Sequence, residues 1–213
     1  MSVTPQTVKP ERIEAESFRI IEAEIGGHGF DPATWAVIRR VIHASGDFSF
    51  AENLRCGNGA IAAGVNAIRA GRNILTDVNM TATGISRNLL TQWGGRVLCG
   101  VADPAVAARA RAEGRTRSEV AIRELLPDNI GIVAIGNAPT ALLRLLELLG
   151  GLPPESRPDL VIGVPVGFVN AAESKELLAR QDYPFITCLG RKGGSPVAAA
   201  IVNALLRLAT EGQ

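Results

Sequence analysis

One histidine of this chain lies in a segment whose residue types and spacing could do acid-base chemistry. His43 comes at the end of an amphipathic stretch that predicts a helix from Pro32 to Ala44, and a helix C-terminus favours the protonated imidazole. Arg40, three residues earlier, shares that helix face and offers a guanidinium that can bind a carboxylate. Asp47, four residues later, could contact the imidazole only if the chain turns back. The pattern fits a proton donor, but by itself it favours a structural histidine at a helix end.

Signatures of other catalytic chemistries are missing from the sequence. There is no GxSxG elbow and no HExxH or Cys/His cluster, so neither a serine triad nor a metal site is predicted. The three cysteines, Cys56, Cys99 and Cys188, lack CxxC spacing. The segment from Gly57 to Ala62 matches GxGxxA, but the residues before it do not resemble an apolar strand, so dinucleotide binding is not expected. The second histidine, His28, is expected to be an exposed loop residue.

Short apolar runs alternate with helical stretches from Ile74 onward. The runs are apolar on both faces, as in parallel strands covered by helices on each side. The expected strands are Asn73 to Thr76, Arg96 to Val101, Ile130 to Ile135, Leu160 to Val164 and Phe185 to Leu189. The expected helices are Thr81 to Gln92, Pro104 to Leu126, Pro139 to Leu149, Ala171 to Arg180 and Pro196 to Ala209. Right-handed crossovers would build an α/β fold, a Rossmann-like open sheet of about five parallel strands with helices on both faces.

Helices are also expected before this sheet. Amphipathic periodicity predicts them over Glu11 to Ile25, Pro32 to Ala44 and about Gly59 to Ala70. They would form an N-terminal helical segment, about residues 10–70, packed on the sheet.

Ligands of open α/β sheets bind outside the carboxyl ends of the strands, and three glycine-rich loops fall there. They run from Gly136 to Thr140, from Pro165 to Lys175 and from Gly190 to Pro196. Asn137 is expected to cap the helix that begins at Pro139. Backbone N–H groups of such loops could hold carboxylates or phosphates, although tight strand-to-helix turns without a ligand explain each loop as well.

Composition excludes several classes of protein. The chain has 22 Lys and Arg residues against 21 Asp and Glu, a net charge of +1, which argues against a general nucleic-acid or membrane-surface binder. The apolar fraction of 46% excludes a wholly disordered chain. The N-terminus lacks the apolar core of a signal peptide, and no run of about 18 uncharged apolar residues occurs. A cytoplasmic protein is therefore expected.

Several segments in combination resemble one known family. The first group is Ile13 to Ile21 (IEAESFRII), Arg40 to Asp47 (RVIHASGD) and Leu75 to Gly84 (LTDVNMTATG). The later loops continue the match with TRS from Thr116, GNAPTAL from Gly136, GVPVGFV from Gly163, AESK from Ala172 and GRKGGS from Gly190. Together they resemble the precorrin-8X methylmutase family of cobalamin biosynthesis, over nearly the whole chain.

The resemblance implies a single methylmutase domain over residues 1–213, an isomerase that needs no cofactor and no metal. Its reaction moves a methyl group of a tetrapyrrole from ring carbon 11 to ring carbon 12, giving hydrogenobyrinic acid or its cobalt form. It further implies a cytoplasmic homodimer with the substrate near the subunit interface, a tightly held product and hand-over to other enzymes of the pathway. The family's catalytic histidine falls on His43, and its substrate-contacting serine and arginine fall on Ser17 and Arg40. Further candidate contacts, taken from the matching motifs, are Thr83, Gly84, Arg117, Ser118, Asn137, Ala138, Pro165, Gly167, Arg191, Gly193 and Gly194.

A 1,5-sigmatropic methyl shift needs an electron-poor ring rather than a nucleophile or a redox centre, which agrees with the missing motifs. His43 as imidazolium could donate to a ring nitrogen, while Arg40, Arg117 and backbone N–H groups of the Gly136, Gly167 and Gly193 loops hold the acidic rim. Two alternatives remain from the sequence: a non-catalytic corrinoid carrier, and an NAD-type oxidoreductase on the same fold. Neither the motifs nor the composition distinguishes a metal-free substrate from a cobalt-containing one.

Overall fold

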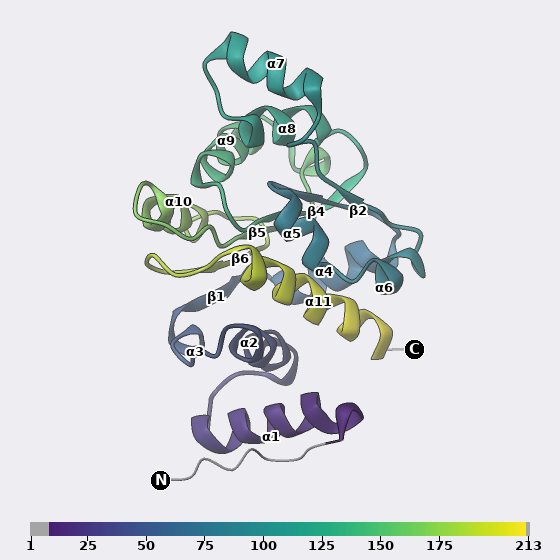
Figure 1. Cartoon of the computed structure of the whole chain (residues 1–213), viewed down its shortest axis with the longest axis vertical. Coiled ribbons are helices and arrows are strands. Elements are labelled where there is room, and N and C mark those ends of the chain that lie inside the picture. The colour runs from purple at the N-terminus through teal and green to yellow at the C-terminus, as the bar shows by residue number, and fades with distance from the viewer. Residues whose placement is uncertain (1–8, 212–213) are drawn as a thin grey trace.

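The computed structural model describes residues 9–211 and contains a six-stranded sheet covered by helices on both faces (Figure 1). The strands are β1 (Leu54–Gly57), β2 (Asn73–Thr76), β3 (Val97–Leu98), β4 (Ile130–Ile135), β5 (Leu160–Gly163) and β6 (Phe185–Cys188). Their order in the sheet is β1-β6-β5-β4-β2-β3. All neighbours from β3 across to β6 are parallel, which confirms the expected five parallel strands.

The strand predictions were wrong at the two edges of the sheet. The strand expected over Arg96 to Val101 is reduced to β3, because only Val97 and Leu98 pair with β2 and this edge has no further neighbour. The short strand β1 was missed, since it is an antiparallel edge strand with the exposed Arg55 at its centre. A strand therefore does precede the GxGxxA match, contrary to expectation. A Cβ on Gly57 would lie 2.3 Å from the ring of Phe185, so this glycine is needed for packing.

Eleven α-helices occur within the described residues. They are α1 (Ile13–Ile25), α2 (Pro32–Ser45), α3 (Phe50–Asn53), α4 (Ala60–Arg69), α5 (Asn79–Gly84), α6 (Arg87–Thr91), α7 (Pro104–Glu113), α8 (Arg117–Leu125), α9 (Pro139–Gly150), α10 (Ala171–Leu178) and α11 (Ser195–Glu211). Single 3-10 turns lie at Pro10–Arg12 and Pro154–Ser156. Most predicted helices differ from these only at their ends, where assignments vary.

Two helix predictions were wrong because each joined two helices. The stretch expected over Thr81 to Gln92 breaks between α5 and α6, and α3 was not expected. The stretch expected over Pro104 to Leu126 breaks at Gly114, which has a φ of +62° and ends α7. Thr116 then starts α8 with a capping box to Glu119.

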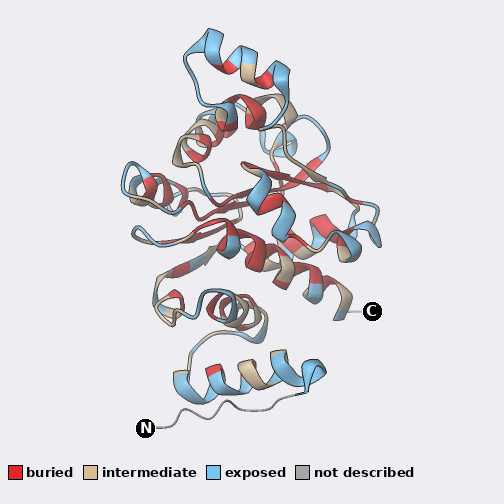
Figure 2. Cartoon of the chain, in the orientation of Figure 1, coloured by how far each residue is buried: buried red, intermediate tan, exposed pale blue. Residues whose placement is uncertain are grey.

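Two apolar layers enclose the sheet (Figure 2). Ile74 and Ile132 face the layer formed by α2, α4 and α11, whereas Leu75 and Val133 face the layer formed by α8, α9 and α10. Successive strand residues point to opposite faces, so burial on both faces requires the unbroken apolar runs seen in the sequence.

The N-terminal helices pack at one end of the molecule (Figure 1). Helix α2 lies against α11 within the main core, while α1 packs mainly against α2 and buries a single residue, Ile21. Within residues 9–211 we find no helix whose length and apolar character would let it cross a membrane.

Candidate active site

The carboxyl ends of the five parallel strands meet at one edge of the sheet. From β2 the chain moves outward to β3, and from β4 it moves outward in the opposite direction to β5 and β6. The strand order therefore reverses between β2 and β4, which is where ligands of open α/β sheets bind. We call this the carboxyl edge.

Asp77, directly after β2, fills the reversal point with a fully buried carboxylate. It accepts hydrogen bonds from the backbone N–H groups of Gly136 (3.1 Å), Asn137 (2.7 Å) and Ala138 (2.8 Å), and from the Thr81 hydroxyl (3.2 Å). The expectation that Asn137 caps α9 was wrong, because the N-cap position is Ala138 and Asp77 satisfies these amides from the neighbouring strand. Sequence reasoning gave Asp77 no role.

The other two loops of the carboxyl edge are bonded to each other. The N–H of Gly167 donates to the carbonyl of Arg191 (3.1 Å), and that of Gly194 donates to the carbonyl of Val164 (2.8 Å). A Cβ on Gly193 would lie only 2.1 Å from the Val164 oxygen, so the loops touch at this glycine. The amides of Gly136, Asn137, Ala138 and Gly167 are thus used inside the protein and are not free for ligand carboxylates.

The remaining candidates on this edge differ in exposure. Thr83 and Gly84 lie exposed on α5, whereas Pro165 is buried. Ser118 is also buried, and its hydroxyl donates to the backbone carbonyl of Asp77 (3.1 Å), which favours a structural role.

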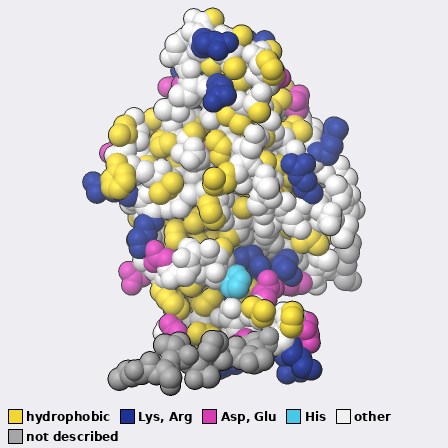
Figure 3. Space-filling model, viewed as in Figure 1, with side chains coloured by type: hydrophobic (Ala, Val, Ile, Leu, Met, Phe, Trp, Pro, Cys, Tyr) yellow, Lys and Arg dark blue, Asp and Glu magenta, His cyan; other side chains and the backbone are white. Residues whose placement is uncertain are grey.

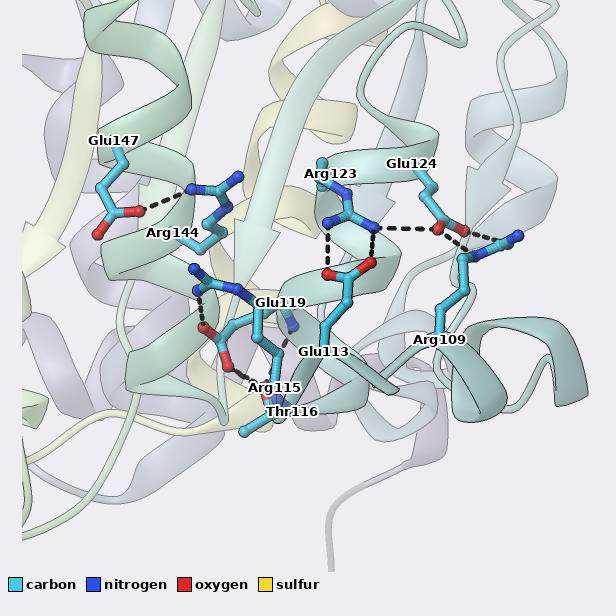
Figure 4. Close-up of polar contacts among 9 residues, drawn as sticks. All are labelled: Arg109, Glu113, Arg115, Thr116, Glu119, Arg123, Glu124, Arg144 and Glu147. Carbon is cyan, nitrogen blue, oxygen red and sulfur yellow. Dashed lines mark hydrogen bonds and ion pairs between the residues drawn. The ribbon is translucent and has the colours of Figure 1, made fainter. Parts of the chain in front are cut away.

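Two exposed arginines on this edge have no acidic partner among the residues that the structure describes. Four neighbouring arginines of α7, α8, α9 and their connections pair with glutamates, as Figure 4 shows: Arg109, Arg115, Arg123 and Arg144. Arg117 and Arg191, by contrast, form no ion pair within residues 9–211, and the Arg191 guanidinium lies 5.4 Å from the ring centroid of Phe168. Both guanidiniums are available to bind carboxylates.

His43 lies exposed in the last turn of α2, beside α1. The rings of His43 and Phe18 form a T-shaped contact, with their centroids 5.5 Å apart and their planes at 78°. Arg40, on the same helix, donates to the carboxylate of Glu14 at 3.1 Å, and half-buried Ser17 lies on α1 between Glu14 and Phe18 in sequence. The hydrogen bond from Arg40 is the largest cause lowering the pKa of Glu14.

A salt bridge brings the His43 helix to the carboxyl edge. Lys192, in the loop after β6, donates to Asp47 (2.6 Å) and to the Ser49 hydroxyl (2.9 Å). Hydrogen bonds, that from Lys192 first and those from Ser49 next, lower the pKa of Asp47 to about 2. Asp47 is therefore engaged by Lys192, and no hydrogen bond joins it to His43 within the described chain.

Exposed apolar side chains gather at the same edge. Met80 follows β2, and Val166, Phe168 and Val169 follow β5, with Phe168 exposed by 83%. Figure 3 shows hydrophobic side chains spread over this face of the molecule and a histidine beside basic and acidic groups near its α1–α2 end. An imidazole, unpaired arginines and apolar side chains together suit a large ligand with an apolar body and an acidic rim.

Comparisons with known proteins identify the family of this chain. The family model described as precorrin-8X methylmutase matches residues 12–208. The chain belongs to the precorrin-8X methylmutase family. It is 43% identical to the cobalt-precorrin-8 methylmutase of Priestia megaterium, covering 98% of this chain and 92% of that protein, and 44% identical to the precorrin-8X methylmutase of Pseudomonas aeruginosa, covering 92% and 94%. A crystal structure of precorrin-8X methylmutase from Thermus thermophilus superimposes with a TM-score of 0.87 at 45% identity, covering 95% of this chain and 97% of that one.

Three charged groups of the candidate site could not be found from the sequence pattern. Glu14 and Lys192 lay inside the resembling segments, but no local signal paired them with Arg40 and Asp47. Asp77 also lies inside a resembling segment, where no pattern assigned it a role. His28 lies in a loop as expected, but the expected exposure was wrong, because its ring is half-buried and stacked on Trp35 with centroids 4.0 Å apart. Within residues 9–211 no three His, Cys, Asp or Glu side chains cluster as metal ligands would.

Proposed function

We propose that this methylmutase moves the methyl group of precorrin-8X, or of its cobalt form, from ring carbon 11 to ring carbon 12. The product is hydrogenobyrinic acid or the corresponding cobalt compound of cobalamin biosynthesis. The single observation that carries the site assignment is the exposed imidazole of His43 at an edge that also presents Arg117 and Arg191, neither of which has an acidic partner in the described part of the chain. Relatives carrying both names, at 43% and 44% identity, support the reaction.

The reaction is an isomerisation in which one carbon–carbon σ bond breaks while another forms. No atom is gained or lost, and the π electrons of the ring shift to compensate. His43, as imidazolium, donates a proton or hydrogen bond to a ring nitrogen beside the migrating carbon, which lowers the electron density of the ring. A positioned donor of this kind contributes about 10²- to 10⁴-fold to the rate.

Binding uses arginines more than backbone amides. Arg117 and Arg191 hold acetate and propionate groups of the rim, and Arg40 joins them when Glu14 gives way. Ser17, Thr83 and the N–H of Gly193, which makes no hydrogen bond within the described residues, complete the proposed contacts. Held in this way, the reacting carbons keep one orientation relative to the imidazole.

A second copy of the chain covers part of this apolar face in the proposed homodimer. The exposed side chains of Met80, Phe168 and Val169 support such a contact, because large exposed apolar groups mark interaction surfaces. Tight retention of the product and its hand-over to other pathway enzymes in the cytoplasm belong to the same proposal. Light scattering of the purified protein measures the oligomeric state, and a monomer would exclude the dimer.

Turnover tests the function and separates it from a carrier role. Purified enzyme mixed with precorrin-8X should convert it to hydrogenobyrinic acid, followed by the absorption spectrum. His43→Asn should lose about 10²- to 10⁴-fold of kcat and still bind the product. Wild-type protein that binds the tetrapyrrole without converting it would be a carrier, and micromolar binding of nicotinamide nucleotides would favour an oxidoreductase.

A further inference from the structure

Lys175, on α10, is completely buried and has no carboxylate partner within residues 9–211. Its amine donates to the carbonyl of Lys192 at 2.5 Å and lies 3.8 Å from the thiol of Cys188. Burial lowers the pKa of this amine. Burying a lysine amine is unfavourable because the amine loses its hydration, whereas an apolar side chain of similar volume would pack there without that loss.

The carbonyl that Lys175 meets belongs to the loop between β6 and α11. The Cys188 thiol donates to the same oxygen at 3.1 Å, so two buried donors hold one backbone carbonyl. Arg191 precedes it, and its exposed guanidinium has no acidic partner within residues 9–211. Gly193 follows it and leaves no room for a Cβ against Val164. The two buried donors therefore fix the direction of the loop where it presents Arg191.

Lys192 is held at its other end as well. Its ammonium group reaches Asp47 at 2.6 Å and the Ser49 hydroxyl at 2.9 Å, both just beyond the helix that carries His43. One residue thus joins two parts of the site: its backbone is fixed from inside by Lys175, and its side chain is fixed to the end of α2. Both contacts are made by Lys192, which directly follows Arg191 in the chain and reaches the end of the helix that carries His43.

We propose that Lys175 and Lys192 are positioning residues of the methylmutase, which hold the Arg191 loop at a set distance from His43. This inference rests on the proposed function and deepens it. Lys175 acts on the loop alone, so it affects how the substrate rim is held. Lys192 acts on the loop and on α2, so it affects both substrate binding and the placement of the imidazole.

The test compares Lys175→Met, Lys192→Met and Lys192→Arg with wild-type enzyme, using precorrin-8X turnover, hydrogenobyrinic acid titration and thermal unfolding. Arg180→Met is the matched control, because it removes an exposed positive charge beyond the end of α10, before β6. We expect Lys175→Met to raise KM and the product dissociation constant about tenfold or more with kcat nearly unchanged, because misplacement by about 1 Å can cost 10²-fold. Its thermal midpoint should stay the same or rise, because a buried amine has been replaced by an apolar group.

Lys192→Met should change both KM and kcat, and Lys192→Arg should restore part of the loss, since arginine can still reach Asp47. Wild-type values of KM and kcat in both methionine variants would overturn the proposal. So would a lowered thermal midpoint with unchanged parameters in the folded fraction, which is the result of a merely structural role. If wild-type enzyme itself fails to convert precorrin-8X, the proposed function fails, whereas altered variants beside an active wild type concern the positioning alone.

Discussion

The carboxylate of Glu14 lies 3.1 Å from the guanidinium of Arg40 and 3.5 Å from that of Arg207. Arg40, three residues before His43, is therefore already paired with a carboxylate of the protein itself. This ion pair joins α1 to α2. Helix α1 otherwise buries only Ile21. A substrate carboxylate that binds Arg40 must displace Glu14 or share the guanidinium with it.

Replacing Glu14 by glutamine should therefore tighten product binding. Partly exposed ion pairs contribute roughly 0.2–1 kcal/mol, so the dissociation constant for hydrogenobyrinic acid should fall about 1.5- to 5-fold. Glu16→Gln is the control, because Glu16 lies on the same helix and pairs with Arg19 instead. Weaker binding in Glu14→Gln, with the control unchanged, would mean that Glu14 holds Arg40 in place for the substrate.

Asp77→Asn should destabilise the fold strongly. An asparagine keeps one acceptor oxygen but turns an NH₂ group toward amides of the Gly136–Ala138 loop, which leaves buried donors unsatisfied. We expect a loss of about 3–5 kcal/mol in the free energy of unfolding, measured by urea titration. Asp103→Asn, at the exposed N-cap of α7, should cost only about 1 kcal/mol or less. Equal losses in the two variants would contradict the role assigned to Asp77.

The contact between Asp47 and Lys192 should make the free energy of unfolding depend on pH in the acid range. The pKa of Asp47 is lowered to about 2, so its carboxylate contributes stability that is complete above the unfolded pKa of about 3.9 and is lost as the pH falls toward about 2. The difference in unfolding free energy between wild type and Asp47→Asn should be constant from pH 5 to 7 and shrink below about pH 4. A difference that stays constant to pH 2 would show that the ion pair does not form.

Two glycines of one loop should respond differently to alanine. Gly190 and Gly193 both have positive φ, +79° and +148°, but a Cβ meets nothing at Gly190 and would lie 2.1 Å from the Val164 oxygen at Gly193. Gly190→Ala should cost about 1–2 kcal/mol of stability from its backbone conformation alone. Gly193→Ala should in addition move the loop and weaken product binding tenfold or more, since small displacements of binding groups have large effects. Similar product affinities in the two variants would argue against contact between this loop and the ligand.

The sequence was most informative where local pattern and burial coincide. The strands β2 and β4 are apolar on both faces, and their bounds were predicted correctly. The edge strand β1 has an exposed arginine at its centre, and the break at Gly114 interrupts a stretch that looks continuously helical, so neither was visible from periodicity.

Within the site, the sequence could name His43 and Arg40 but not their charged surroundings. Lys192 lies 145 residues from Asp47, and Arg40 lies 26 residues from Glu14. Such pairs depend on how the helices dock, and no spacing rule along the chain encodes them. The same holds for Asp77, whose carboxylate takes the loop amides that were expected to bind the ligand.

The position of His43 relative to the bound macrocycle is the most direct measurement of the proposed chemistry. In a crystal structure of the complex with hydrogenobyrinic acid, a ring nitrogen of His43 should lie within about 3.2 Å of a macrocycle nitrogen, with Arg117 or Arg191 on a peripheral carboxylate. A complex in which the imidazole reaches none of the four ring nitrogens, directly or through one water, would contradict the assignment of His43 as the donor.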